Sequence, residues 1–142
     1  MDIRQITDRF FAAPQIDAAD FAALADAGFG LVINNRPDTE VGPDQHSETM
    51  RAAAEAAGLQ FVVNPLTMET MTLDRQAVQR DSAAGCDGKV LAYCRSGTRS
   101  TICWALSQAK EMDVADIVNA AANGGYDVSG LVPHLEALKS EG

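Results

Sequence analysis

The stretch from Val90 to Lys110 constrains the fold more than any other part of this chain. It begins with four apolar residues that end at Tyr93, continues through a polar loop, and ends in a segment from Thr101 that favours a helix. A short apolar run followed by a glycine-containing loop and a helix is typical of a β-strand that leads directly into a helix. The chain is therefore expected to build a sheet with helices packed against it.

Strand and helix patterns alternate along the rest of the chain. The predicted strands cover residues 9–13, 31–33, 60–64 and 90–93, and the predicted helices cover 17–27, 47–57, 73–84, 101–110, 114–122 and 132–139. Ser47 and Thr72 are the predicted N-caps of the second and third helices. This alternation predicts an α/β fold with a central, mostly parallel sheet of four or five strands flanked by helices. The length of 142 residues fits a single domain, 1–142.

The loop between the last predicted strand and its helix, called the cysteine loop below, combines a thiol with two arginines. Its residues are Cys94, Arg95, Ser96, Gly97, Thr98, Arg99 and Ser100. Backbone N–H groups of such a loop and the positive end of the following helix together form a site for an anion. Nearby guanidinium groups favour the thiolate over the thiol. Cys94 is therefore predicted to be a catalytic nucleophile.

Three arginines have separate predicted roles at this site. Arg99 is expected to supply the main fixed charge toward the anion, and Arg95 is expected to lie at its entrance. Arg36 follows the second predicted strand, and ligand sites of α/β folds collect at such strand ends. Arg36 is expected either to reach the anion or to form an ion pair with Asp38 or Glu40.

The remaining residues of the cysteine loop are assigned backbone and hydroxyl roles. The N–H groups of residues 95–100 are expected to bind the anion. Gly97 permits a positive φ and a close approach of the backbone to a ligand. Ser100 is expected to donate its hydroxyl to the sulfur of Cys94, to cap the helix, or to do both.

Charge and composition exclude several kinds of partner. A formal net charge of −9 disfavours nucleic acids and anionic membranes, which require a basic surface. No apolar run approaches the roughly 20 residues of a membrane span, and the first residues lack the pattern of a signal peptide, so a cytoplasmic location is expected. Three cysteines and two histidines show no metal-ligand spacing, so no metal and no cofactor are expected. Cys86 and Cys103 are expected to be structural.

Several segments resemble a bacterial family, the phosphatase-like domain of β-lactamase hydrolase-like proteins. They are Pro14-Gln15, Ala27-Gly28-Phe29, Val32 to Glu40, Ala56-Ala57-Gly58 and Ala92 to Ser100. The resemblance implies a fold like that of dual-specificity phosphatases. Some members are fused to a metallo-β-lactamase-like persulfide dioxygenase. Because 142 residues leave no room for that second domain, a stand-alone form is expected here, and the resemblance implies such a dioxygenase as a partner.

The spacing in the cysteine loop departs from the phosphatase signature. That signature places histidine before the nucleophile and arginine six positions after it, whereas Tyr93 precedes Cys94 here and Arg99 follows it by five. The shorter spacing is similar to the loop of rhodanese-type sulfurtransferases. In those enzymes the cysteine takes sulfur from thiosulfate or another donor and carries it as a persulfide.

The segment after the third predicted strand bears on the same choice. It contains no aspartate, and Glu69 is its only acid. A general acid that protonates a leaving oxygen contributes about 10²- to 10⁴-fold, whereas sulfite leaves thiosulfate without a proton. A sulfurtransferase acting on thiosulfate or a persulfide is the main hypothesis. The alternatives are a phosphatase for aryl phosphates with Glu69 or Asp38 as acid, and a non-catalytic module that binds anions or senses oxidation.

Overall fold

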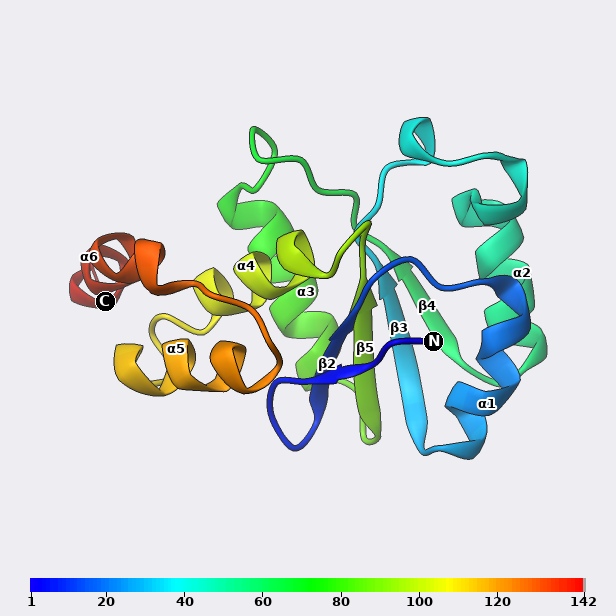
Figure 1. Ribbon diagram of the computed structural model, residues 1–142, viewed down its shortest axis with the longest axis horizontal. Helices are drawn as coiled ribbons and strands as arrows, with labels where there is room; N and C mark the ends of the chain where they lie inside the picture. The colour runs from blue at the N-terminus through cyan, green and yellow to red at the C-terminus, as the bar shows by residue number, and fades with distance from the viewer. Residues whose placement is uncertain (142) are drawn as a thin grey trace.

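A five-stranded sheet forms the centre of the computed structural model, which describes residues 1–141 (Figure 1). The strands are β1 (Arg4–Gln5), β2 (Phe10–Ala13), β3 (Phe29–Asn34), β4 (Gln60–Val63) and β5 (Lys89–Tyr93). Their order across the sheet is β1-β2-β5-β3-β4, with β2, β5, β3 and β4 parallel and β1 antiparallel to β2. The strand that leads into the cysteine loop is therefore the central one.

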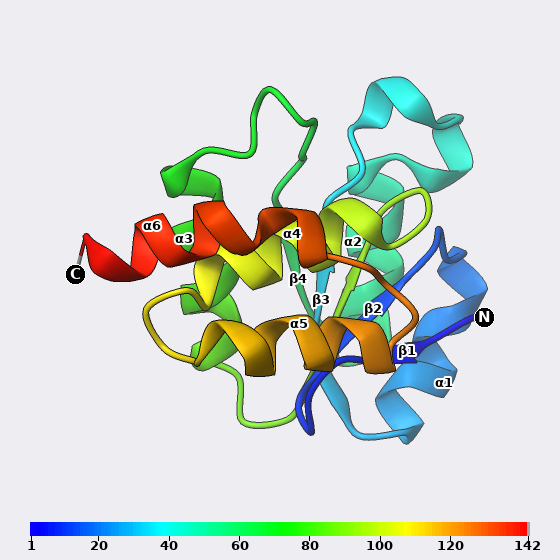
Figure 2. The same ribbon diagram turned by 60° about the vertical axis from the view of Figure 1, so that its left-hand side comes forward.

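Helices cover both faces of this sheet (Figures 1 and 2). One face carries α1 (Phe21–Asp26) and α2 (Ser47–Ala56), and the other carries α3 (Leu73–Ala84), α4 (Thr98–Ser107), α5 (Val114–Asn123) and α6 (Val132–Ser140). This is the predicted α/β architecture with a mostly parallel sheet. Among the described residues, no helix is long and apolar enough to cross a bilayer.

Side chains of β5 alternate between two apolar cores. Val90 and Ala92 pack with Trp104 on the side of α4, while Leu91 and Tyr93 pack with Phe21 on the side of α1. All four strand residues are at most 1% exposed. A central parallel strand that is buried on both faces reads as a continuous apolar run, and this explains why the sequence pattern located it.

Two local predictions were wrong, and one strand was missed. Helix α4 begins at Thr98 rather than Thr101, because the positive φ of Gly97 (91°) lets the chain turn into the helix within the loop. Ser47 is not the N-cap of α2, because its N–H and its hydroxyl both donate to Asp38 at 2.8 Å and His46 takes the cap position. Strand β1 was missed, since it consists of two exposed polar residues at the sheet edge.

Truncation of the central strand should destabilise the whole domain. Leu91 is completely buried, so Leu91→Ala removes apolar contacts and leaves a cavity, and we expect the free energy of unfolding to fall by about 3 kcal/mol. Urea denaturation measures this difference. Val78→Ala, at a side chain that is 42% exposed on α3, is the matched control and should change the value by less than about 0.5 kcal/mol. Equal losses in the two variants would contradict the proposed core.

Candidate active site

The nucleophile predicted from the sequence lies at the carboxyl end of β5. Cys94 has no exposed surface, and its Sγ atom accepts a hydrogen bond from the N–H of Gly97, with an N···S distance of 3.1 Å. Gly97 has a φ of 91°, as predicted, and it precedes the first residue of α4. The sulfur therefore lies below a tight turn that leads into a helix N-terminus, where partial positive charge favours an anion.

The carbonyl groups of the cysteine loop are bound by donors on its outer side. The carbonyls of Arg95 and Ser96 both accept hydrogen bonds from outside the loop. Their donors are the Gln15 N–H and the Tyr126 hydroxyl, at 3.3 and 3.0 Å. In a trans peptide the C=O and N–H groups point in opposite directions. Binding these carbonyls on the outside leaves the following N–H groups to face the interior of the loop.

Arg99 lies in the first turn of α4 and is held by a two-pronged ion pair. Its Nη1 and Nη2 donate to the two carboxylate oxygens of Glu40 at 2.9 and 2.7 Å, and its Nη1 also donates to the Leu66 carbonyl at 2.7 Å. These three bonds use three of the five guanidinium N–H groups. The hydrogen bond from Arg99 holds the pKa of Glu40 below its usual range, and the same bond raises the pKa of Arg99, to which the charge of Cys94 also contributes.

Arg36, which lies in the loop after β3, binds the same carboxylate. Its Nε donates to Glu40 at 3.3 Å, and its Nη1 donates to the Gln15 side chain at 3.2 Å. Of the alternatives open from the sequence, the structure forms the ion pair with Glu40 and not with Asp38. Arg95 is exposed, and no ion pair or side-chain hydrogen bond involves it within residues 1–141.

The structure does not form either bond predicted for Ser100. Its hydroxyl is buried and has no hydrogen-bond partner in the described part of the chain, so it does not bind Cys94. It does not cap α4 either, because the helix begins two residues before it. Cys86 and Cys103 are buried as expected, and burial raises the pKa of Cys103 to about 12. Cys103 therefore stays a thiol and does not compete with Cys94.

Two candidate acids predicted from the sequence have different surroundings. One carboxylate oxygen of Asp38 accepts both donors of Ser47, which ties it to the start of α2. Glu69 is exposed on a turn closed by hydrogen bonds between Thr67 and Thr70. That turn follows Leu66, whose carbonyl binds Arg99. The segment that carries Glu69 is therefore anchored directly to the cysteine loop.

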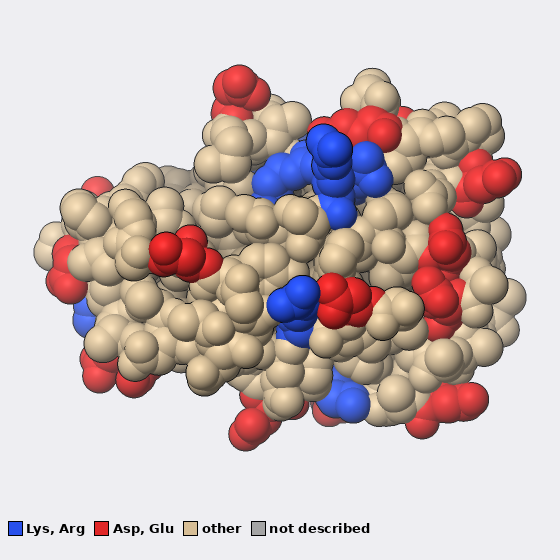
Figure 3. Space-filling model, in the orientation of Figure 1, with Lys and Arg blue, Asp and Glu red and all other residues tan. Residues whose placement is uncertain are grey.

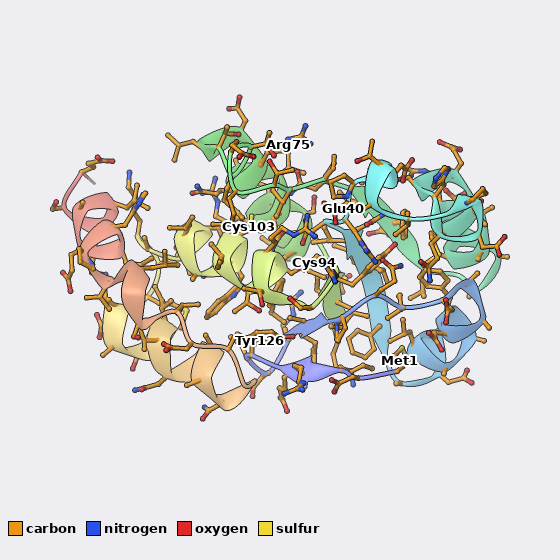
Figure 4. The ribbon with its side chains drawn as sticks, turned by 45° about the horizontal axis from the view of Figure 1, so that its top comes forward. Met1, Glu40, Arg75, Cys94, Cys103 and Tyr126 are labelled. Atoms are coloured by element: carbon orange, nitrogen blue, oxygen red, sulfur yellow. The ribbon has the colours of Figure 1, made fainter. Side chains whose placement is uncertain are left out.

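Sequence reasoning missed the roles of two residues that lie on either side of Cys94 in Figure 4, Glu40 and Tyr126. Glu40 was considered only as a partner of Arg36. No pattern in the sequence distinguishes Tyr126 from a core residue, whereas its hydroxyl donates to the Ser96 carbonyl of the cysteine loop. Gly124 and Gly125 indicate a turn before Tyr126, but no local pattern indicates which residues that turn contacts.

Basic side chains gather over the carboxyl ends of the central strands, as Figure 3 shows, with acidic side chains directly beside this cluster and elsewhere on that face. Arg36, two residues after β3, and Arg99 of the cysteine loop both pair with Glu40, and Arg95 is an exposed residue of the same loop. On a chain with a net charge of −9, such a cluster attracts an anion to one place and leaves it repelled elsewhere.

Comparison with known families matches residues 2–111 to the phosphatase-like domain of β-lactamase hydrolase-like proteins. The chain belongs to this family. A β-lactamase hydrolase-like protein of Agrobacterium fabrum is 33% identical over 148 residues, covering 94% of this chain. The chain spans only about a third (34%) of that relative's length.

Solved structures share the fold of this phosphatase-like domain. A candidate phosphatase from Neisseria meningitidis Z2491 is 27% identical, with a TM-score of 0.82 and coverage of 97% of this chain and 99% of that one. A cysteine-to-serine variant of TpbA from P. aeruginosa, solved in complex with pTyr, is 15% identical with a TM-score of 0.62, covering 99% and 91% of the two chains. The second similarity establishes the fold alone.

Acid should weaken the contribution of Glu40 to stability. Its pKa is lowered only in the folded state, so the unfolded chain binds the proton more tightly. The contribution is complete above the ordinary pKa of 4.5 and is lost as the pH falls through the lower folded-state value. We expect the difference in unfolding free energy between the wild type and Glu40→Gln to shrink below pH 4.5, as measured by urea denaturation across pH.

A control separates the ion pair from the general effect of removing a charge. Glu136→Gln changes an exposed carboxylate on α6 and should differ little from the wild type at every pH. A stability gap for Glu40→Gln that is the same on both sides of pH 4.5 would show that the pairing with Arg99 and Arg36 is not its source.

Proposed function

We propose that this domain is a cysteine-dependent phosphatase that hydrolyses phosphate monoesters through a phosphocysteine intermediate. The observation that carries the proposal is the combination of Cys94 below the N-terminus of α4 with a guanidinium, Arg99, fixed beside it. Membership in a phosphatase-like family and the similarity to a candidate phosphatase at 27% identity support it. The pTyr complex of a protein of the same fold favours an aryl phosphate as substrate.

The first half of the reaction transfers the phosphoryl group to sulfur. The Cys94 thiolate attacks phosphorus, an S–P bond forms, and the bond from phosphorus to the ester oxygen breaks, with its electron pair leaving on that oxygen. Inward-facing N–H groups of the cysteine loop and the remaining N–H groups of Arg99 bind the equatorial oxygens. Donors that are fixed before the reaction stabilise developing charge without having to reorganise.

The second half releases phosphate. A water molecule attacks the phosphocysteine, a P–O bond forms, the S–P bond breaks, and the thiolate returns with inorganic phosphate as the second product. The Gly97 N–H that binds Sγ in the structure stabilises the sulfur as it regains its charge. The same donor therefore serves both the free nucleophile and the departing thiolate.

Glu69 is the residue we assign as general acid for the leaving oxygen. Asp38 is already bound by Ser47, and Glu40 is engaged by two arginines that hold it ionised. Glu69 has neither constraint and lies on the turn that follows the Arg99 contact at Leu66. The turn is fixed at Leu66, where the carbonyl binds Arg99, and it is exposed at Glu69. Such a turn can bring the Glu69 carboxyl group to a bound substrate.

The sulfurtransferase hypothesis stays as a second candidate because of one observation, the spacing of five positions from Cys94 to Arg99. In that reaction the thiolate attacks the outer sulfur of thiosulfate, an S–S bond to Cys94 forms, the S–S bond of thiosulfate breaks, and its electron pair leaves on sulfite. An acceptor thiolate would then attack the outer sulfur of the Cys94 persulfide, which breaks its S–S bond and returns the Cys94 thiolate, and the acceptor persulfide would be the substrate of a persulfide dioxygenase. The family and the similar solved structures favour the phosphatase over this candidate.

Intact mass after a rapid quench separates the two reactions. With p-nitrophenyl phosphate we expect release of p-nitrophenol and a gain of one phosphoryl group on the protein, both abolished in Cys94→Ser. Cys103→Ser is the matched control and should keep both, since burial holds that thiol protonated. A gain of one sulfur atom from thiosulfate, removed by cyanide and without any phosphoryl gain, would replace the phosphatase by the sulfurtransferase.

Leaving-group dependence tests the role of Glu69. A poor leaving group needs a proton, so kcat of Glu69→Gln on phenyl phosphate should fall by about 10²-fold or more, while kcat on p-nitrophenyl phosphate should fall far less. Asp38→Asn is the matched control: we expect lower thermal stability, from the altered contact to Ser47, with unchanged leaving-group dependence. Equal effects of Glu69→Gln on the two substrates would remove Glu69 as the acid.

A further inference from the structure

We infer that Tyr126 is a positioning residue for the nucleophile: its hydroxyl fixes the peptide between Ser96 and Gly97 and thereby aims the Gly97 N–H at Cys94. This inference rests on Cys94 being the nucleophile of the proposed function. A residue outside the sheet and outside the cysteine loop thereby acts on the reactive sulfur through one peptide unit.

Two hydrogen bonds on opposite sides of one peptide unit carry the argument. The Tyr126 hydroxyl donates to the Ser96 carbonyl at 3.0 Å, and the Gly97 N–H donates to Cys94 Sγ at 3.1 Å. This carbonyl and this N–H belong to the same planar trans peptide, so they point in opposite directions. Holding the carbonyl outward through Tyr126 therefore sets the N–H inward, toward the sulfur.

The peptide needs an external restraint because it adjoins a glycine. Gly97 adopts a φ of 91° and has no Cβ to limit rotation of the neighbouring peptides. A rotated peptide would turn the Ser96 carbonyl oxygen toward the anion site and repel the ligand. Tyr126 occupies the space on the outer side, since a Cβ built on Gly97 would overlap its hydroxyl oxygen.

Tyr126 is itself held by the end of α5. Its N–H donates to the Ala121 carbonyl at 2.9 Å, and the Gly125 N–H donates to the Ala122 carbonyl at 2.9 Å. With Gly125 at a φ of 91°, this pair of bonds is the Schellman motif that terminates many helices. The motif places Tyr126 at a fixed position relative to the helix axis.

The hydroxyl of Tyr126 stays a donor near neutral pH. Burial raises its pKa above the usual range, the negative charge of Cys94 adds to that shift, and the guanidinium of Arg4 opposes it. The family match ends at residue 111, so this contact comes from the part of the chain beyond it. The C-terminal helices thus contribute to the site and do not only cover the sheet.

Tyr126→Phe tests the inference because phenylalanine keeps the ring and removes only the hydroxyl. The thiolate titration of Cys94 is measured as the ultraviolet difference between each protein and the same protein carrying Cys94→Ser. We expect its midpoint to move upward by about one pH unit and the affinity for inorganic vanadate to fall about tenfold, since a hydrogen bond to a charged acceptor is weakened. The melting temperature should change little.

Tyr93→Phe is the matched control. It removes a buried phenol hydroxyl that has no hydrogen-bond partner within the described residues, and it should leave the titration midpoint unchanged. A Tyr126→Phe protein with the wild-type midpoint and wild-type vanadate affinity would overturn the inference, even if its melting temperature fell. The titration requires no turnover, so it separates a failure of this inference from a failure of the proposed phosphatase activity.

Hydrogen exchange gives a test that does not depend on the variant folding. In the wild-type protein the Gly97 amide should be protected, because its N–H is bound to sulfur and its peptide is restrained. Exchange of that amide at the rate of an open loop would overturn the inference. Loss of protection on Tyr126→Phe alone, with Tyr93→Phe unaffected, would support it.

Discussion

An ionisable sulfur buried at the end of the central strand is the constraint on which this structure depends. Cys94 has no exposed surface, so water cannot solvate its charge and the protein must supply the donors. The Gly97 N–H and the N-terminus of α4 meet this need directly. Because β5 is buried on both faces between two helical layers, the sulfur and its donors are held on a rigid support.

Behind the groups that contact the sulfur, one carboxylate orients two arginines. Glu40 accepts both prongs of Arg99 and one bond from Arg36, which orients two guanidinium groups that would otherwise repel each other. Since Glu40 cancels only part of their charge, the site stays positive enough to attract an anion while the two guanidinium groups are held apart. In the proposed reaction, the charge of a bound phosphate adds to an arrangement that is already ordered.

Predictions from the sequence were correct where a feature depends on contacts between residues that are close in the chain. The apolar run of β5, the capping of α3 by Thr72 and the positive φ of Gly97 all depend on neighbouring residues, and each was predicted correctly. The predicted bond from Ser100 to Cys94 failed because it depended on the turn at which α4 begins. The sulfurtransferase hypothesis, which rested on the loop spacing and on the missing aspartate after the third predicted strand, is less well supported than the phosphatase alternative, which the family and the similar solved structures favour.

The sequence by itself determined a strand, a loop and a helix with Cys94 at their junction, because backbone geometry and side-chain periodicity act over a few residues. Only the tertiary structure decided which distant groups complete the site. Arg99 and Glu40 are 59 positions apart, and Tyr126 and Ser96 are 30 apart. Such pairs meet because β3 lies beside β5 and because α5 ends over the cysteine loop. The local sequence around each of these residues does not predict either placement.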